Sequence, residues 1–182
     1  MDWLSSVAAT SGPAPWAVDR GPEDMAPDRR LLEILTRHGV RFVVIGGHAV
    51  NFHGSLRATE DTDVLWTRSP DTEMHLLAAL CELDARFIGN EIDPATGVEQ
   101  THPVTAAFVR STRLMMLCTN AGFLDLFDYV PGFPEEPVAT VWDTAVDLDG
   151  VKFASLEWLR RMKRAAGRPK DLLDLENLAD PA

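Results

Sequence analysis

The sequence contains little of what marks zinc-binding, exported or membrane proteins. Only two cysteines occur, Cys81 and Cys118, and no CxxC motif or Cys/His cluster suggests a zinc site. Each cysteine lies in an apolar run, LLAALCEL or LMMLCTN, which predicts two buried, reduced thiols. No apolar run approaches the ~18 residues that span a bilayer, and the first residues, MDWLSS, lack the cationic and apolar regions of a signal peptide. We therefore expect a cytoplasmic protein with no membrane partner.

Positive charge is also scarce. The formal net charge is -11, so the chain as a whole is no counter-ion for a nucleic-acid duplex or an anionic membrane. This disfavours a protein that coats DNA or RNA. It still allows an enzyme that contacts a nucleotide or an RNA through one local basic patch.

What the sequence does contain is a normal core for a globular domain. Its 182 residues are 46% hydrophobic and 25% charged. Residues 1–26 are rich in Ser, Ala, Gly and Pro, which predicts a flexible N-terminal lead-in. Residues 27–182 are predicted to form one domain that includes a C-terminal helical segment.

The order of predicted elements indicates the fold class. Helical spacing and capping residues predict helices over 28–38, 48–53, 71–85, 156–166 and 169–178. Short apolar runs predict strands at 41–45, 61–66, 86–88, 104–109, 114–119 and 123–130, a polar loop at 90–102, and a tight turn at 147–150 between two further strands. This order predicts an α/β (α+β) protein, a mixed β-sheet flanked by helices.

Two short motifs follow the first predicted strand. Gly46 and Gly47 end that strand and begin a helix, an arrangement whose free N–H groups suit a phosphate. A structural turn without a ligand is the competing interpretation. Asp61 and Asp63 alternate on the next strand and so share one face, where their mutual repulsion favours a bound divalent cation such as magnesium. The competing interpretation is a strand end exposed to water.

Two later features complete a candidate site. Asp125 is the single acid inside the apolar run FLDLF, and it is the best candidate for a third carboxylate, unless it faces water from an edge strand. The segment RRMKRAAGRPK is the one strongly basic stretch of an acidic chain. Lys163 within it is a candidate substrate-facing cation, against the alternative of a solvated helix face.

Taken together, these segments resemble a known family. GGHAVNFHGSLRATEDTDVLW is similar to the core of the nucleotidyltransferase superfamily, the DNA polymerase β-like fold, and most of all to its AbiEii/AbiGii toxin-type small bacterial members. The segment LEWLRRMKRAAGRPKDLLDLENL resembles the C-terminal helices of that family. The resemblance extends over roughly residues 28–178 and is weak between 67 and 120.

The resemblance implies a site with two Mg²⁺ ions and a nucleoside triphosphate. It assigns metal binding to Asp61, Asp63 and Asp125, with Asp125 as a possible base, and catalytic roles to these three and Lys163. It assigns nucleotide binding to Gly46, Gly47, Arg57, Thr59, Lys163, Arg168 and Asp171. Arg57 has a competing interpretation, as a residue that fixes its loop by pairing with a carboxylate.

The function implied is transfer of a nucleoside monophosphate from a nucleoside triphosphate to an RNA (tRNA) or protein acceptor. It would fit the toxin of a toxin–antitoxin or phage-defence system, with a cognate antitoxin as partner. Three alternatives stay open: an antitoxin-like transferase that modifies a partner toxin, a small-molecule (aminoglycoside-type) nucleotidyltransferase, and a non-catalytic nucleotide-binding module.

Overall fold

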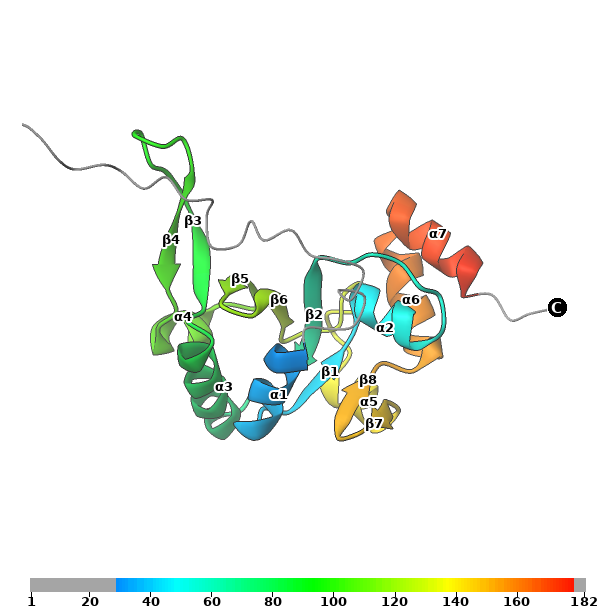
Figure 1. The fold of residues 1–182 in the computed structure, drawn as a ribbon. Helices are drawn as coiled ribbons and strands as arrows, with labels where there is room; N and C mark the ends of the chain where they lie inside the picture. Colours follow the sequence, from blue (N-terminus) through cyan, green and yellow to red (C-terminus); the bar gives the residue numbers. More distant parts are fainter. Residues whose placement is uncertain (1–28, 179–182) are drawn as a thin grey trace, which may run out of the picture.

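The computed structural model describes residues 29–178, so the predicted lead-in at 1–26 lies outside the described residues. Within this range helices and strands alternate up to α3, after which the strands come in consecutive pairs and two helices end the described chain (Figure 1). The helices are α1 (Arg29–Arg37), α2 (Gly46–Phe52), α3 (Pro70–Glu82), α4 (Ala106–Ser111), α5 (Val138–Asp143), α6 (Leu156–Ala166) and α7 (Pro169–Asn177). The strands are β1 (Phe42–Val44), β2 (Asp61–Trp66), β3 (Arg86–Ile92), β4 (Glu99–Pro103), β5 (Leu114–Thr119), β6 (Gly122–Phe127), β7 (Val146–Leu148) and β8 (Val151–Phe153).

All eight strands belong to one mixed sheet, in the order β4-β3-β5-β6-β2-β1-β8-β7. The pairs β2–β6 and β1–β8 are parallel, and the other neighbours are antiparallel. The prediction of a mixed α/β architecture with C-terminal helices is therefore confirmed. Strand β2 lies at the centre, between β6 and β1, where both of its faces can be covered.

Helices bury the central strands from both sides. On β2, Val64 and Trp66 belong to a cluster of buried apolar side chains that includes those of α1 and α3. Leu65 points the other way, into a second cluster with side chains of α5 and α6. Since successive side chains on a strand alternate, Asp61 and Asp63 share the face of Leu65. The acids of β2 thus lie on the side of the sheet that α6 covers.

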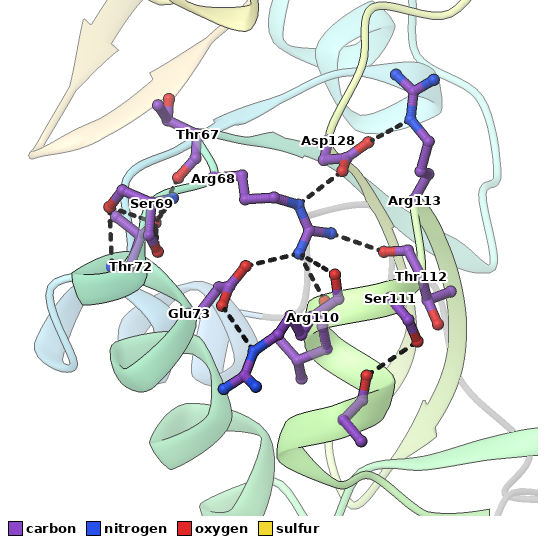
Figure 2. Close-up of polar contacts among 12 residues, drawn as sticks. Thr67, Arg68, Ser69, Thr72, Glu73, Arg110, Ser111, Thr112, Arg113 and Asp128 are labelled. Atoms are coloured by element: carbon purple, nitrogen blue, oxygen red, sulfur yellow. Dashed lines mark hydrogen bonds and ion pairs between the residues drawn. The ribbon is translucent and has the colours of Figure 1, made fainter.

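The far end of β2 is joined to its surroundings by one side chain, Arg68 (Figure 2). Its Nε donates to Asp128 Oδ2 at 2.7 Å, its Nη1 donates to Glu73 Oε1 at 2.9 Å, and its guanidinium lies 4.6 Å from the centre of the Trp66 ring. The remaining donors bind backbone carbonyls around the end of α4, namely those of Val109 (2.8 Å), Arg110 (3.1 Å) and Thr112 (2.8 Å). Arg68 therefore ties β2 to α3, α4 and β6.

Three local predictions are wrong. Residues 104–109 do not form a strand, because the Thr105 hydroxyl accepts the N–H of Phe108 and caps helix α4. The polar segment 90–102 is not a loop, since it contributes to the β3–β4 hairpin. Strand β3 pairs with β5 only at Arg86 and Phe87, so the rest of this hairpin projects from the body, which explains its polar composition (Figure 1). Cys81 is a free thiol as expected, but it is exposed.

Within the described part of the chain, no helix is both long enough and apolar enough to cross a membrane.

Candidate functional site

Three aspartates come together where β2 and β6 run side by side. The parallel register pairs Asp63 directly with Asp125, and it pairs Asp61 with Phe123. Residues in register on neighbouring strands point to the same face, so Asp61, Asp63 and Asp125 share one face of the sheet. The structure thus places side by side the three acids that the sequence suggested.

The electrostatics of these acids show that they are crowded. Burial, followed by the neighbouring Asp61 carboxylate, raises the pKa of Asp63 above its ordinary value. Burial, followed by the charges of Asp63 and Asp61, raises the pKa of Asp125 to about 7. Among residues 29–178, no hydrogen bond or ion pair reaches any of these three carboxyl groups. Their negative charge is therefore left without a direct partner.

This donor set has the chemistry that a hard divalent cation takes, since carboxylate oxygens are the preferred ligands of Mg²⁺. As the side chains stand, no group of three or more His, Cys, Asp or Glu residues in the described range is arranged to hold a metal ion. Binding would thus require the carboxylates to turn toward a common point. Asp63 and Asp125 are directly paired on adjacent strands, so rotation of their side chains can bring the two carboxylates toward one ion.

Two glycines make room for this cluster at the start of α2. Gly46 has φ +61°, a conformation that favours glycine, and a Cβ there would lie 1.9 Å from Asp63 Oδ2. A Cβ on Gly47 would lie 2.5 Å from Thr59 Oγ1 and 3.0 Å from Arg57 Nη2. The first glycine therefore lets Asp63 approach the backbone, and the second lets the following loop close over it.

The loop between α2 and β2 is fixed by Asn51. The Asn51 side chain accepts the backbone N–H of Arg57 at 2.9 Å, and its amide donates to the carbonyl of Arg57 at the same distance. The Thr59 hydroxyl donates to the carbonyl of Asp61 at 3.3 Å. These contacts hold Arg57 beside Gly47. Asn51 was not singled out from the sequence, because a single Asn on a short helix carries no recognisable signal.

A buried ion cluster lies next to the three acids, and it contains Arg57, Lys163, Arg168, Asp171 and Asp174. Asp171 and Asp174 are each 1% exposed and Lys163 is 5% exposed. The Lys163 ammonium lies 3.2 Å from Asp171 Oδ1 and 2.6 Å from Asp174 Oδ2. Arg57 Nε lies 2.8 Å from Asp174 Oδ1, and Arg168 Nε donates to Asp171 Oδ2 at 2.5 Å. The cluster thus joins the α2–β2 loop, α6 and α7.

Both carboxylates of the ion cluster are paired with cations. Burial alone would raise the pKa of Asp171, but hydrogen bonds from Arg168 and Lys163 outweigh it and hold that pKa below its ordinary value. Three cations face two carboxylates, which leaves an excess of positive charge on this side. This positive charge also acts on the neighbouring acids of the sheet, since Lys163 and Arg168 both act to lower the pKa of Asp63.

The basic residues of the segment RRMKRAAGRPK do not all face the same side: some are buried and others are exposed. Lys163 is buried and already bound to two aspartates, so the direct phosphate contact expected of it stays a prediction. Lys170 is exposed in the first turn of α7, and its charge acts on both Asp63 and Asp125. Among residues 29–178 no ion pair involves Lys170. Lys170 and Arg168 are therefore the accessible cations nearest the acids.

Two members of this region were missed from the sequence. Asp174 follows Asp171 by three residues, a spacing that puts both on one side of a helix. That spacing was the available signal, but burial of two acids beside exposed Leu172 and Leu173 runs against the usual pattern. Lys170 was seen only as part of the basic run, because the sequence does not say which of its cations face the sheet.

Near the start of α2, His48 is 4% exposed and its Nδ1 has no hydrogen-bond partner among the described residues. Burial, followed by the charge of Arg57, lowers the pKa of His48 to about 4. The imidazole is therefore neutral at pH 7 and does not offset the acids.

No protein-family model and no curated protein matches the chain. Seven chains of solved structures do match. One is the crystal structure of JHP933 from Helicobacter pylori, with a TM-score of 0.44 and 16% sequence identity over 83% of this chain. This chain spans 64% of the length of that structure's chain. Similarity at this level carries no argument about activity.

Proposed function

We propose that this chain is a magnesium-dependent nucleotidyltransferase with a nucleotidyltransferase fold, which moves a nucleoside monophosphate from a nucleoside triphosphate to an acceptor. The observation that carries the proposal is the group of Asp61, Asp63 and Asp125 on one face of β2 and β6, next to the basic side of α6 and α7. Nucleotidyl transfer needs oxygen ligands for divalent cations and positive charge where pyrophosphate leaves.

Asp61, Asp63 and Asp125 would hold Mg²⁺. When bound, the ion neutralises phosphate charge and orients the attacking and leaving oxygens. A divalent cation would also relieve the repulsion that raises the pKa of Asp63 and Asp125. The Asp125 carboxylate, on the strand beside Asp63, would be the group that accepts the proton of an acceptor hydroxyl.

The cations would divide the remaining work. Arg168 and Lys170 would contact the triphosphate from the first turn of α7, because both are accessible and lie toward the acids. Lys163 would act through Asp171 and Asp174, by holding α7 in place. Its positive charge would still reach the site, since it already acts on Asp63.

The start of α2 would accommodate the phosphates. Gly46 and Gly47 have no side chains that could obstruct the approach of a phosphate, and Arg57 and Thr59 lie against Gly47. Arg57 would keep the loop in place through its pair with Asp174, which is the structural role considered from the sequence. A nucleotide contact by Arg57 or Thr59 would come in addition to that role.

The acceptor and the biological setting rest on the resemblance of the sequence motifs alone. On that ground the acceptor would be an RNA, such as a tRNA, or a protein. The chain would then act as the toxin of a toxin–antitoxin or phage-defence system, or as its antitoxin-like counterpart.

The test is transfer of label from each of the four α-labelled nucleoside triphosphates, with magnesium, to bulk RNA or to total protein. We expect transfer by the native chain and a loss of at least about 100-fold in Asp63→Asn and Asp125→Asn, which keep the shape and remove the charge. Asp143→Asn is the matched control, since Asp143 is exposed at the end of α5. It should transfer normally.

Calorimetry with Mg²⁺ and a non-hydrolysable nucleotide separates the enzyme from a binding module. Magnesium-dependent nucleotide binding that Asp63→Asn abolishes, without transfer to any acceptor, would favour the non-catalytic module. Absence of both binding and transfer, or transfer that survives in Asp63→Asn, would overturn the proposal.

A further inference from the structure

A pocket lies at the opposite end of β1 from Gly46. It has a volume of about 390 Å³ and lies between the end of α1, the start of β1, α5 and the β7–β8 hairpin. Thr36, Arg41, Trp142, Asp147, Gly150 and Lys152 are among the residues that line it. None of these belongs to the acids or to the ion cluster described above.

Two cations lie against one indole ring in this pocket. The Arg41 guanidinium is 4.5 Å and the Lys152 ammonium 5.1 Å from the centre of the Trp142 ring. The strands explain this convergence. Lys152 is in register with Val43, and Arg41 lies two residues before Val43, so all three point to the face that α5 covers. Trp142 on α5 contacts both cations with its ring.

The two cations have no carboxylate or carbonyl partner among residues 29–178. The acid that lines the pocket is Asp147, which is opposite Lys152 on β7. Asp147 Oδ1 instead accepts the N–H of Gly150 at 3.0 Å. In a chain of net charge -11, Arg57, Arg68, Lys163 and Arg168 are ion-paired, whereas Arg41 and Lys152 contact an aromatic ring and leave their N–H donors available.

We propose that this pocket binds the phosphoryl group of a nucleotide. A guanidinium and an ammonium that come from neighbouring strands and line the same pocket can both donate charge-assisted hydrogen bonds to a phosphate. The Thr36 hydroxyl at the rim supplies one more donor. The pocket is open to solvent, with Arg41 exposed at its edge, so the rest of the ligand can extend outward from the phosphate.

This site is separate from the proposed transfer site. Arg41 precedes Gly46 by five residues of mostly extended chain, roughly 16 Å. The phosphoryl group could come from a free mononucleotide or from the backbone of an RNA, and both present the same chemistry to Arg41 and Lys152. The inference stands on the pocket alone and does not need the chain to be a transferase.

The test is a two-dimensional ¹⁵N–¹H NMR titration of the full chain with AMP, with adenosine and with a short single-stranded RNA. The reporters are the Trp142 indole N–H, assigned with Trp142→Phe, and the Gly150 amide. We expect saturable shifts with AMP and none with adenosine, and an affinity about tenfold lower in Arg41→Gln and in Lys152→Gln. Arg29→Gln is the matched control, since Arg29 is exposed on α1 and pairs only with Glu33 among the described residues.

The arms of the titration separate the sources of the phosphate. Equal affinity for AMP and for RNA, counted per strand, identifies a mononucleotide site. Markedly tighter binding of the RNA identifies the backbone of a polynucleotide. The proposal is overturned if adenosine shifts the reporters as AMP does, if neither phosphate-bearing ligand shifts them, or if Arg29→Gln weakens binding as much as Arg41→Gln.

Discussion

The charged side chains at the two ends of β2 differ in whether they are paired. Beyond its last residue, Arg68 is surrounded by acceptors, and every donor nitrogen of its guanidinium has a partner (Figure 2). At its first residues, the carboxyl groups of Asp61 and Asp63 lie on the same face as that of Asp125, and none of the three accepts a hydrogen bond from the described residues. Both ends belong to the same strand of the same sheet. The two ends therefore differ in the hydrogen-bond partners of their charged groups and not in their place in the fold.

This difference separates stabilising from functional charge. A buried charge that is fully paired costs much to disturb, and its pairing is complete without a ligand. A carboxylate whose pKa is raised by burial and by like charges costs stability, so the folded protein keeps it at the expense of the free energy of unfolding. A site of the second kind favours the binding of a ligand of opposite charge.

The largest expected effect is at the Arg68 end. Arg68→Leu should lower the free energy of unfolding by about 3–5 kcal/mol, because it leaves Glu73 and three carbonyls without their donor. Arg110→Leu is the control, since Arg110 is 75% exposed and lies 3.8 Å from Glu73. It should cost less than about 1 kcal/mol. Urea unfolding of both variants checks this, and equal costs would mean that Arg68 is no more than a surface ion pair.

Asp125→Asn is expected to raise the free energy of unfolding, whereas Arg68→Leu lowers it. The pKa of Asp125 in the folded state is about 7, above the value in the unfolded chain, so its ionisation destabilises the fold as pH rises from about 4 to 7. Without divalent cations, the variant should therefore be more stable than the native chain by roughly 2–4 kcal/mol at pH 7 and show no gain at pH 4.

Asp143→Asn serves as the control for Asp125→Asn and should leave stability unchanged at both pH values. Thermal or urea unfolding at pH 4 and pH 7 provides the measurement. A loss of stability in Asp125→Asn at pH 7 would show that the carboxylate is paired after all, and the contrast with Arg68 would then disappear.

Lowering the pH should destabilise the folded chain through protonation of His48. The unfolded chain protonates this histidine near pH 6.5, whereas the folded chain does so near pH 4, so stability from the neutral imidazole is lost as pH falls between these values. The native chain should lose roughly 3 kcal/mol more than His48→Leu over this window. The exposed His75 is the control, and His75→Leu should follow the native pH profile. If His48→Leu also follows that profile, the imidazole is not buried neutral.

The smallest effect concerns Gly46. Gly46→Ala and Gly54→Ala both place a side chain at positive φ, which costs about 1–2 kcal/mol. A Cβ at Gly54 meets nothing within 4 Å, whereas one at Gly46 meets Asp63. The difference in urea-unfolding free energy between the two variants therefore measures the contact with Asp63. No difference would mean that the Asp63 side chain moves aside freely.

Sequence reasoning succeeded where the signal is local. The bounds of β2 and the shared face of Asp61 and Asp63 followed from alternation, and Ser155 caps α6 as expected. Asp125 was singled out as the one acid in an apolar run, but its pairing with Asp63 did not follow from that pattern, because the register of two strands far apart in the chain leaves no local trace. The projecting β3–β4 hairpin was missed for a related reason, since a hairpin exposed on both sides lacks the apolar alternation of a covered strand.

The ion cluster shows a further limit. Its partners come from the α2–β2 loop, α6 and α7, and only folding brings them together. A surface helix usually buries its leucines and exposes its acids. Instead Leu172 is 52% and Leu173 57% exposed, while Asp171 and Asp174 are inside.

This inverted helix has a consequence for where the protein can be shortened. A helix attached mainly by apolar contacts can often be trimmed at a graded cost, but removing α7 would take away Asp171 and Asp174, the carboxylates that pair with Lys163 and Arg57. Residues 169–178 are therefore an integral part of the domain and not an appendage. Any shorter version of the chain that ends at Gly167 would also have to replace Lys163 and Arg57 in order to fold.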